Sequence, residues 1–392
     1  MTKITDIPAI RFKGFSDTWE QRKLGDLVDV CSGRDYKHLS EGDIPVYGTG
    51  GYMLSVSEAL SYDKDAIGIG RKGTIDKPYI LNAPFWTVDT LFYAIPREKI
   101  DLDFAFDIFQ NIDWKKKDES TGVPSLSKAA INEIGVLVPQ YDEQQVLGEF
   151  FNGIGNLITL HQRKYDKLTN VKKSMLEKMF PQNGSNVPEI RFKGFTEAWE
   201  QRKLSEIATM HARIGWQNLR TSEFLDSGDY MLITGTDFID GAVNFDTCHY
   251  VERERYEQDK HIQIRNGSIL ITKDGTLGKV AYIQGLTMPA TLNAGVFNVE
   301  IKDENEVDNR YLFQYLKAPF LMDYVDKKAT GGTIKHLNQN ILVDFPVVLP
   351  HKAEQEKIGE YFLAIDHLIT LHQRELEKLK KLKKACLEKM FV

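Results

Sequence analysis

The chain contains two copies of the same short segments, one near each end of each half. Residues 11–15 (RFKGF) are repeated 180 positions later, and residues 157–163 (LITLHQR) are repeated 211 positions later. The ends of the two halves therefore match, whereas their middles differ in length and sequence. A shared frame with different inserts predicts two similar modules that read two different targets from one internally symmetric platform.

The composition is ordinary for a globular protein, with 42% hydrophobic and 27% charged residues in 392 positions, and the length fits two domains. The three cysteines (Cys31, Cys248 and Cys386) form no CxxC motif, which is typical of a reducing compartment. The first residues lack the apolar core of a signal peptide, and no run reaches the roughly 18 apolar residues that span a bilayer. We therefore expect a soluble, cytoplasmic protein.

The net charge of −6 argues against strong nucleic-acid binding by this chain alone. The charge is uneven, however. Residues 161–180 carry six basic groups against two acidic ones, and residues 374–392 carry seven against three. Such runs are typical of solvated helix faces.

The last part of each half predicts one long helix. The apolar positions are spaced by four and three residues, which is typical of a coiled coil. In the second copy these positions are Ile358, Phe362, Ile365, Ile369, His372, Leu376, Leu379, Cys386 and Met390. About 38 residues at 1.5 Å per residue give a rod of about 57 Å. Two such rods in one chain most simply pack on each other as a spacer.

His161 and His372 fall at equivalent positions on this apolar seam. Two histidines could contribute to a metal site, but a site needs further ligands. The alternative is a polar seam residue that fixes register and pairing, which we favour.

The remainder of each half alternates short β-rich runs with Gly, Asn and Asp turns. The expected strands are residues 44–47, 66–69, 79–81, 86–94, 230–233, 268–272 and 280–283. One shorter helix is expected in each half, at residues 104–117 and 311–328. Of the 31 extra residues in the second copy, 22 precede the turn at Gly275, so the insertions concentrate in one part of the domain. Surface loops of this kind usually carry binding specificity.

Together these patterns predict an α+β protein: two similar α/β recognition domains joined by two long antiparallel coiled-coil helices, in a pseudo-twofold internal repeat. The predicted boundaries are residues 1–141 for the first domain, 142–181 for the first helix, 182–187 for a linker, 188–352 for the second domain and 353–392 for the second helix.

Two equivalent turns, at residues 70–74 and 272–276, carry basic side chains at the ends of expected strands. Arg71, Lys72 and Lys273 could clamp phosphate or reach guanine, and Asp274 could accept from cytosine N4. A plain turn would also explain Lys-Gly and Asp-Gly. The presence of basic groups in both copies favours the binding interpretation.

Two further loops have the composition of a recognition surface. The glycine-rich loop at residues 47–52 fits neither the P-loop nor the G-x-G-x-x-G motif, so a phosphate or nucleotide loop is less favoured than a tight turn or a close approach to another ligand. The segment 213–218 combines Arg, Gln, Asn and Trp, which suit base edges and sugar stacking. Its alternative is a loop whose tryptophan packs on its own domain.

No catalytic constellation is found in the sequence. Residues 82–85 (NAPF) are similar to the loop with which amino-methyltransferases hold a flipped base, but the second position departs from it and no S-adenosylmethionine loop precedes it. Nuclease carboxylate clusters, helicase motifs and zinc spacings are absent from the sequence as well. We predict that this chain is not an enzyme and binds no metal or cofactor.

The duplicated frame resembles the specificity subunit of type I restriction–modification systems. Residues 10–24 and 190–204 look like its repeated N-terminal segment, and residues 139–180 and 350–391 look like its two long helices. Residues 47–52, 70–74, 86–92 and 331–337 are similar to stretches of its target-recognition domains. The resemblance covers essentially the whole chain and is looser in the variable parts.

The resemblance implies a DNA-binding, non-catalytic protein in defence against foreign DNA. Each target-recognition domain would read one half of a split, asymmetric double-stranded DNA site, and the helices would set the spacing and dock two methyltransferase subunits. Motor and nuclease subunits complete such a complex, which methylates adenine and cuts DNA with ATP. S-adenosylmethionine, ATP and Mg²⁺ are expected in those partners.

The residues that we expect to contact DNA come from both domains. They are Arg34, Thr49, Tyr52, Arg71, Lys72 and Thr74 in the first, and Arg213, Trp216, Gln217, Thr234, Lys273, Asp274 and Thr276 in the second. The residues expected at the methyltransferase-docking surface are Gln162, Arg163, Gln373 and Arg374. The main alternative is a coiled-coil adaptor whose paired domains bind protein or sugar rather than DNA.

Overall fold

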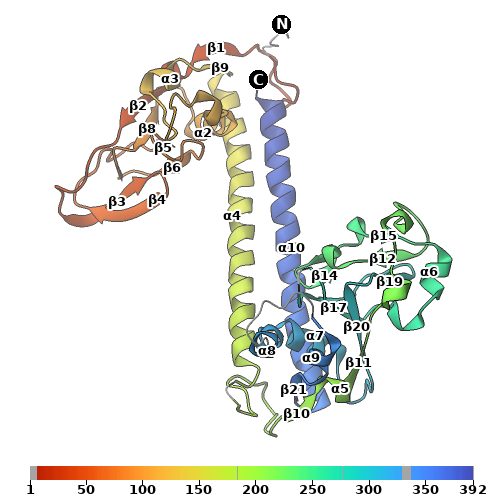
Figure 1. Ribbon diagram of the computed structural model, residues 1–392. Coiled ribbons are helices and arrows are strands. Elements are labelled where there is room, and N and C mark those ends of the chain that lie inside the picture. Colours follow the sequence, from red (N-terminus) through yellow and green to blue (C-terminus); the bar gives the residue numbers. More distant parts are fainter. Residues whose placement is uncertain (1–6, 183, 276, 329–336, 392) are drawn as a thin grey trace. The chain divides into compact units, whose positions relative to one another are not determined.

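The computed structural model describes residues 7–182, 184–275, 277–328 and 337–391. The chain divides into two compact units, one formed by Met1–Lys164 with His372–Val392 and one formed by Tyr165–Leu371. Each unit combines one recognition domain with a segment of each long helix (Figure 1). The two units are described separately below.

The described part of the first unit contains three β-sheets. A two-stranded antiparallel sheet pairs β1 with β9, a four-stranded antiparallel sheet has the order β2-β8-β5-β6, and a three-stranded sheet has the order β4-β3-β7 with β3 and β7 parallel. The strands are β1 Glu20–Lys23, β2 Val28–Ser32, β3 Glu41–Gly48, β4 Gly51–Val56, β5 Ala66–Gly70, β6 Tyr79–Leu81, β7 Trp86–Thr87, β8 Leu91–Pro96 and β9 Gly135–Val138.

The second unit repeats this plan with an additional hairpin. Its sheets are β10-β21, β11-β20-β17-β18, β15-β12-β19-β16 and β13-β14. The strands are β10 Glu200–Lys203, β11 Ala208–His211, β12 Met231–Ile233, β13 Phe238–Ile239, β14 Ala242–Val243, β15 His249–Tyr250, β16 Gln263–Ile264, β17 Ile269–Thr272, β18 Val280–Tyr282, β19 Ala290–Leu292, β20 Val296–Ile301 and β21 Pro346–Leu349.

The long helices are α4, Tyr141–Lys178, and α10, Lys352–Met390. In the first unit His161 of α4 contacts His372 of α10, and Phe151 packs on Phe391 with ring centroids 5.7 Å apart. In the second unit Lys172 contacts Asp366, and Phe180 stacks on Phe362. Within each unit, residue numbers rise along one helix as they fall along the other. The helix segments are therefore antiparallel, which confirms the predicted fold class.

The shorter helices differ from the prediction in one respect. Each helix expected in a half is two pieces: α2 (Leu102–Asn111) followed by the 3₁₀ turn η1 (Trp114–Lys117), and α7 (Asn309–Lys317) followed by α8 (Phe320–Lys328). The second break falls at Pro319, whose ring cannot continue a helix interior. The remaining helices are α1 Leu24–Leu27, α3 Lys128–Asn132, α5 Leu204–Ile207, α6 Arg253–Glu257 and α9 Gln339–Val343, with 3₁₀ turns η2 Gly215–Gln217, η3 Thr221–Glu223, η4 Gly235–Asp237, η5 Phe245–Thr247 and η6 Lys260–Ile262.

One predicted strand is also divided. Residues 86–94, which were predicted as one strand, instead contribute to two consecutive strands, β7 and β8, which belong to different sheets. The chain turns between them, where Leu91 N–H donates to Val88 O at 3.0 Å. Continuous β-forming residues do not reveal where a strand changes sheet.

Equivalent contacts fasten each recognition domain to the first turn of a long helix. Arg11 makes a two-pronged ion pair with Glu143, at 2.6 and 2.7 Å, and Arg191 makes the same pair with Glu354, at 2.7 and 2.8 Å. Both glutamates are almost fully buried. The sequence repeat is thus also a repeat of buried charge pairs.

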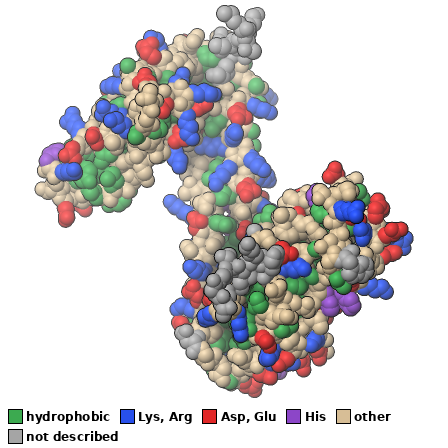
Figure 2. All heavy atoms as spheres, viewed as in Figure 1, with side chains coloured by type: hydrophobic (Ala, Val, Ile, Leu, Met, Phe, Trp, Pro, Cys, Tyr) green, Lys and Arg blue, Asp and Glu red, His purple; other side chains and the backbone are tan. Residues whose placement is uncertain are grey.

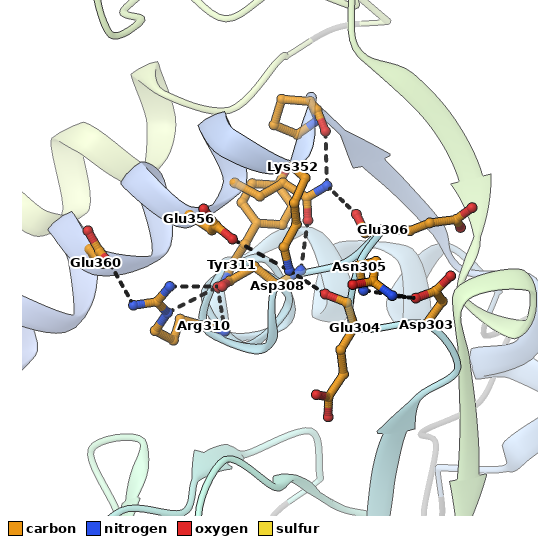
Figure 3. A network of polar contacts seen from close by, with 12 residues as sticks. Asp303, Glu304, Asn305, Glu306, Asp308, Arg310, Tyr311, Lys352, Glu356 and Glu360 are labelled. Carbon is orange, nitrogen blue, oxygen red and sulfur yellow. Dashed lines mark hydrogen bonds and ion pairs between the residues drawn. The ribbon is translucent and has the colours of Figure 1, made fainter.

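In the second unit further polar contacts join the start of α7 to α10, and Figure 3 shows several of them. Gln355 accepts from Asp308 N–H at 3.0 Å and donates to Glu306 O at 3.0 Å. Lys352 donates to Glu304 O at 2.7 Å, and Arg310 pairs with Glu360 at 2.9 Å. In the first unit Gln144 likewise accepts from Asp101 N–H, at 3.1 Å. The start of α2 or α7 is therefore fixed to a long helix in both units.

Among the described residues, the two largest hydrophobic cores each include residues from the long helices. Phe180 packs among Trp199, Tyr311 and Phe362, and Phe391 packs among Trp19, Phe104 and Phe151. Cys31, Cys248 and Cys386 are free thiols. Within the described ranges, no helix combines the length and the apolar character needed to cross a membrane.

A glycine of each long helix allows the close approach of α2 or α7. A Cβ on Gly148 would lie 2.9 Å from the Phe104 nitrogen, and a Cβ on Gly359 would lie 2.8 Å from the Tyr311 nitrogen. Both neighbours are backbone atoms, which cannot move away alone. Larger residues at these two positions therefore force the helix pair apart.

We expect Gly148→Ala to lower the melting temperature of the protein, although alanine favours helix over glycine by about 1 kcal/mol. Gly153 lies in the same helix with nothing within 4 Å of a Cβ, so Gly153→Ala should raise the melting temperature. Thermal unfolding of the two variants measures this contrast. A rise in both would show that α2 does not pack against Gly148.

Candidate nucleic-acid interface

The turns that follow β5 and β17 are equivalent in structure as well as in sequence. Arg71 N–H donates to Thr90 O at 2.8 Å, and Arg71 O accepts from Leu126 N–H at 2.9 Å. In the second unit Lys273 N–H donates to Gly295 O at 2.9 Å, and Lys273 O accepts from Leu337 N–H at 2.8 Å. The two basic residues thus stand at the same backbone position in both domains.

Their side chains also lie in the same way. The Arg71 guanidinium is 5.8 Å from the centre of the Phe92 ring, and Lys273 Nζ is 5.5 Å from the centre of the Phe297 ring. An aromatic face attracts a cation and limits its movement. Each turn therefore presents one oriented positive charge at the end of a strand.

The other candidates of the first domain lie on solvent-facing loops and strand ends. Arg34 is exposed, with its backbone held by Thr87 and Trp86 at 2.9 Å each. Thr49 lies in the turn of the β3–β4 hairpin, and Tyr52 on β4 is 63% exposed. Lys72 is exposed beside Arg71, and Thr74 is half-buried. All of these positions except Thr74 present an accessible side chain or loop to a ligand.

Two candidates of the second domain are corrected by the structure. Arg213 is 2% exposed and Gln217 is 5% exposed, so neither presents its side chain to DNA in this conformation. The Arg213 guanidinium donates to Leu292 O at 3.0 Å and to Gln258 Oε1 at 3.2 Å. Burial and the nearby Arg255 lower the pKa of Arg213. The buried Arg213 side chain therefore links the backbone at Leu292 to the side chain of Gln258.

The remaining candidates of the second domain differ in accessibility. Thr234 is half-buried at the N-cap position of the turn η4, where its backbone N–H and its hydroxyl donate to Asp237 Oδ2 at 2.8 and 2.9 Å. Lys273 and Asp274 are half-buried. Thr276 and the side chain of Trp216 lie outside the described residues. Among the expected contacts of this domain, Lys273 has the clearest geometry.

The expected partner-binding residues lie on the repeated segment of the long helices. Arg163 and Arg374 are exposed, and Gln162 and Gln373 are half-buried. Four leucines beside them were not predicted from the sequence. Leu157, Leu160, Leu368 and Leu371 are 46%, 45%, 41% and 45% exposed, respectively. Their signal in the sequence is that they belong to the repeated LITLHQR segment but fall outside the 4-3 apolar spacing of the seam.

Two groups of histidines bring ring nitrogens close together. His161 Nδ1 and His372 Nδ1 are 3.1 Å apart on the helix seam, and burial, then His161, lowers the pKa of His372. Within the described ranges, His211, His261 and Glu300 could also approach one ion. However, the two rings are stacked 4.5 Å apart at 21°, and nearly parallel ring planes do not meet at a common metal position. We assign no metal to either group.

The fold and the repeated frame define a two-domain protein on paired long helices, and comparison with known proteins identifies its family. A family model described as the type I restriction modification DNA specificity domain matches residues 16–170 and 196–381. The chain belongs to this family. The predicted resemblance is thereby confirmed.

Individual relatives agree with this assignment. The type I restriction enzyme MjaVIII specificity subunit of Methanocaldococcus jannaschii is 24% identical over 283 residues, which are 69% of this chain and 64% of the relative. The putative MjaX specificity subunit of the same organism is 24% identical over 269 residues, covering 66% and 59%. The chain thus spans about three-fifths of the length of these relatives. A crystal structure of the S subunit of a type I restriction–modification system from M. genitalium has the same fold, with a TM-score of 0.69, 15% identity, and coverage of 98% and 99% of the two chains.

Proposed function

We propose that this chain is the sequence-specific DNA-binding subunit of a type I restriction–modification complex, in which each recognition domain reads one half of a bipartite, asymmetric site. The observation that carries the proposal is the matched pair Arg71 and Lys273. Each is a cation held over an aromatic ring at the same strand end, in two domains that differ in length. Such side chains can reach guanine edges or phosphates. The family to which the chain belongs supports DNA as the target.

In this proposal the chain itself catalyses no reaction. Methyl transfer to adenine, translocation and cutting belong to two methyltransferase subunits and to motor and nuclease subunits, which would hold S-adenosylmethionine, ATP and Mg²⁺. The net charge of −6 supports this division. On the face drawn in Figure 2, basic and acidic side chains are interspersed over the recognition domains. Partners would then supply much of the phosphate contact in the cytoplasm, and the chain alone would bind DNA weakly.

The proposal is tested by mapping adenine methylation in cells that express this chain together with its methyltransferase partner. We expect one split motif that is absent from cells lacking the chain. Replacing residues 25–140 with those of another family member should change one half of that motif alone. If the complex assembles but no chain-dependent motif appears, the specificity role is wrong and the adaptor alternative gains support.

We expect Arg71→Ala to weaken binding of the assembled complex to its motif by about 1–3 kcal/mol if the guanidinium reads a base. A competition assay with DNA altered at single positions measures where discrimination is lost. An equal loss on all sequences would assign Arg71 to phosphate. Lys64→Ala, at an exposed lysine of the same domain, is the control and should bind as the parent does. Unchanged affinity of Arg71→Ala would remove this residue from the interface.

The methyltransferase subunits would dock on the exposed faces of the long helices. Leu157 and Leu160 are repeated as Leu368 and Leu371, and all four are exposed next to charged side chains. Exposed apolar side chains at equivalent positions suit a contact that is made twice with the same partner. Gln162, Arg163, Gln373 and Arg374 would form the polar edge of these two surfaces.

We expect the double variant Leu157→Asp and Leu160→Asp to reduce the number of methyltransferase subunits bound per chain, because buried carboxylates oppose an apolar contact. Mass measurement of the purified complex gives this number. Leu382, which is 46% exposed but lies outside the repeated segment, provides the matched control Leu382→Asp. The docking surface is elsewhere if the control variant behaves like the double variant or if neither changes the stoichiometry.

A further inference from the structure

The helices α2 and α7 carry side chains of opposite charge on the face turned to the long helices. Each helix starts after an aspartate cap, Asp101 or Asp308, which puts the two in register. Three aligned positions of that face follow at a spacing of four and three residues. They are Asp103, Asp107 and Gln110 in α2, and Arg310, Gln314 and Lys317 in α7. We call these sets the acidic stripe and the basic stripe.

In the second unit the basic stripe meets carboxylates on α10. Arg310 Nη1 pairs with Glu360 at 2.9 Å. Gln314 Nε2 donates to Asp366 Oδ2 at 2.8 Å, and Lys317 Nζ is 3.5 Å from Asp366 Oδ1. Asp366 also pairs with Lys172 of α4 at 2.5 Å. The carboxylate of Asp366 on α10 therefore contacts both the recognition domain and Lys172 of α4.

In the first unit one of these two long-helix carboxylates is kept, because Glu149 is equivalent to Glu360, and the other is absent. The lysine equivalent to Lys172 is Lys383, and the position equivalent to Asp366 is Gly155. A Cβ on Gly155 would lie 3.8 Å from Lys383 Nζ, so no long-helix carboxylate occupies this place. Asp107, Gln110, Gly155 and Lys383 instead line one cavity of about 710 Å³. The acid near the lysine therefore belongs to the long helix in the second unit (Asp366) and to the recognition domain in the first unit (Asp107).

Asp107 is buried, so the position of this acid affects the stability of the first unit. Asp107 is 2% exposed, and its Oδ2 has no hydrogen-bond partner among the described residues. Burial raises the pKa of the Asp107 carboxyl to about 8, and the charge of Lys383 offsets only part of that rise. Burial lowers the pKa of Lys383, whereas the charge of Asp107 raises it. Each group favours the charged form of the other, and a buried charge that loses its partner is costly.

We infer that the two stripes form a charge match that decides which recognition domain can pack on which pair of helix segments. The surface around Lys383 accepts a domain whose stripe supplies an acid at the position of Asp107. The surface around Asp366 accepts a domain whose stripe is neutral or basic at the position of Gln314. This inference rests on the fold and is independent of what the domains bind.

Exchanged domains would meet the wrong charges. With the basic stripe, Lys383 would face Gln314 and Lys317 in place of Asp107 and Gln110, whereas Arg310 would still have an acid at Glu149, the equivalent of Glu360. With the acidic stripe, Asp107 would face Asp366, with Lys172 as the cation between them. Domains from other family members should therefore be accepted at the first position only when they carry an acidic stripe. The DNA-contacting loops place no such condition on the exchange.

The test transfers the second unit's arrangement to the first in the full chain. Asp107→Gln removes the acid and should lower the melting temperature by about 5–10 °C, because the half-buried Lys383 loses the acid with which it lines the cavity. Adding Gly155→Asp supplies the carboxylate from the long helix instead. We expect the double variant to regain most of the loss. Gly155→Asp alone adds a second acid and should not stabilise the protein.

A matched control separates charge from helix propensity. Gly153 lies in the same helix, and a Cβ there meets nothing within 4 Å. Gly153→Asp changes the same residue type away from Lys383 and should not rescue Asp107→Gln. If Asp107→Gln does not yield folded protein, adding Lys383→Met removes the unpaired cation and should restore folding. Equal rescue by the two glycine replacements would overturn the inference.

The second unit gives an independent test in the opposite direction. Asp366→Asn should lower the melting temperature because Lys172 and Lys317 lose their carboxylate. Gln314→Asp moves an acid onto the recognition domain, as in the first unit, and should restore stability. The inference fails if Gln314→Asp gives no rescue, or if Asp366→Asn and Asp107→Gln leave the melting temperature unchanged.

Discussion

Arg191→Ala is expected to lower the free energy of unfolding by about 3–5 kcal/mol, because it leaves a buried carboxylate without its partner. Glu354 is 0% exposed and accepts from two guanidinium nitrogens of Arg191 at 2.7 and 2.8 Å. Equilibrium unfolding in urea measures the loss. Arg11→Ala tests the equivalent pair with Glu143 and should behave in the same way.

The control for this prediction is an ion pair at the surface. Lys203 and Asp344 are 2.7 Å apart, with side chains 58% and 56% exposed. Water and salt screen such a pair, so Lys203→Ala should cause little measurable change. If Arg191→Ala is no more destabilising than Lys203→Ala, the buried pair does not hold the recognition domain on the helix.

Phe180→Ala is expected to cost about 3–5 kcal/mol, since it removes a large side chain from a core that cannot close over the space. Phe180 is 1% exposed and lies just past the end of α4. Its ring is 6.2 Å from that of Trp199 and 5.9 Å from that of Phe362. Urea unfolding again gives the magnitude, and hydrogen exchange should locate the loosening in the second unit.

Phe180→Leu keeps much of the volume and serves as the graded control. We expect a loss smaller than that of the alanine variant. Phe391→Ala provides the equivalent change in the first unit, where the ring packs on Trp19 and Phe104 at 6.1 and 5.6 Å. Similar stability of the alanine and leucine variants would mean that the space left by Phe180 is filled by its neighbours.

The sequence predicted the frame well because the frame is periodic and repeated. The 4-3 spacing places Phe362, Ile365 and Leu376 inside, and all three are buried. The shorter helices were less accessible to prediction. The break before α8 could have been read from Pro319, but the end of α2 at Asn111 has no such signal. Strands β7 and β8 are separated by tertiary pairing that no local pattern encodes.

The candidate site was predicted in part. Arg71 and Lys273 could be aligned by their turns, whereas the rings beneath them, Phe92 and Phe297, were missed because the cation–ring contact joins separate strands. Arg213 was misassigned because an arginine in a loop is usually exposed. Its guanidinium instead satisfies carbonyl oxygens inside the domain, and only the three-dimensional arrangement reveals this.

The composition of the first unit has a consequence for synthesis on the ribosome. Its core contains Trp19 and Phe104 together with Leu387, Met390 and Phe391, whereas the core of the second unit is drawn from an uninterrupted stretch of chain. Domains usually fold in the order in which they emerge. In this protein the second unit emerges later from the ribosome but can complete its fold before the first unit. The N-terminal domain must wait as an incomplete intermediate until residues near position 390 have left the ribosome.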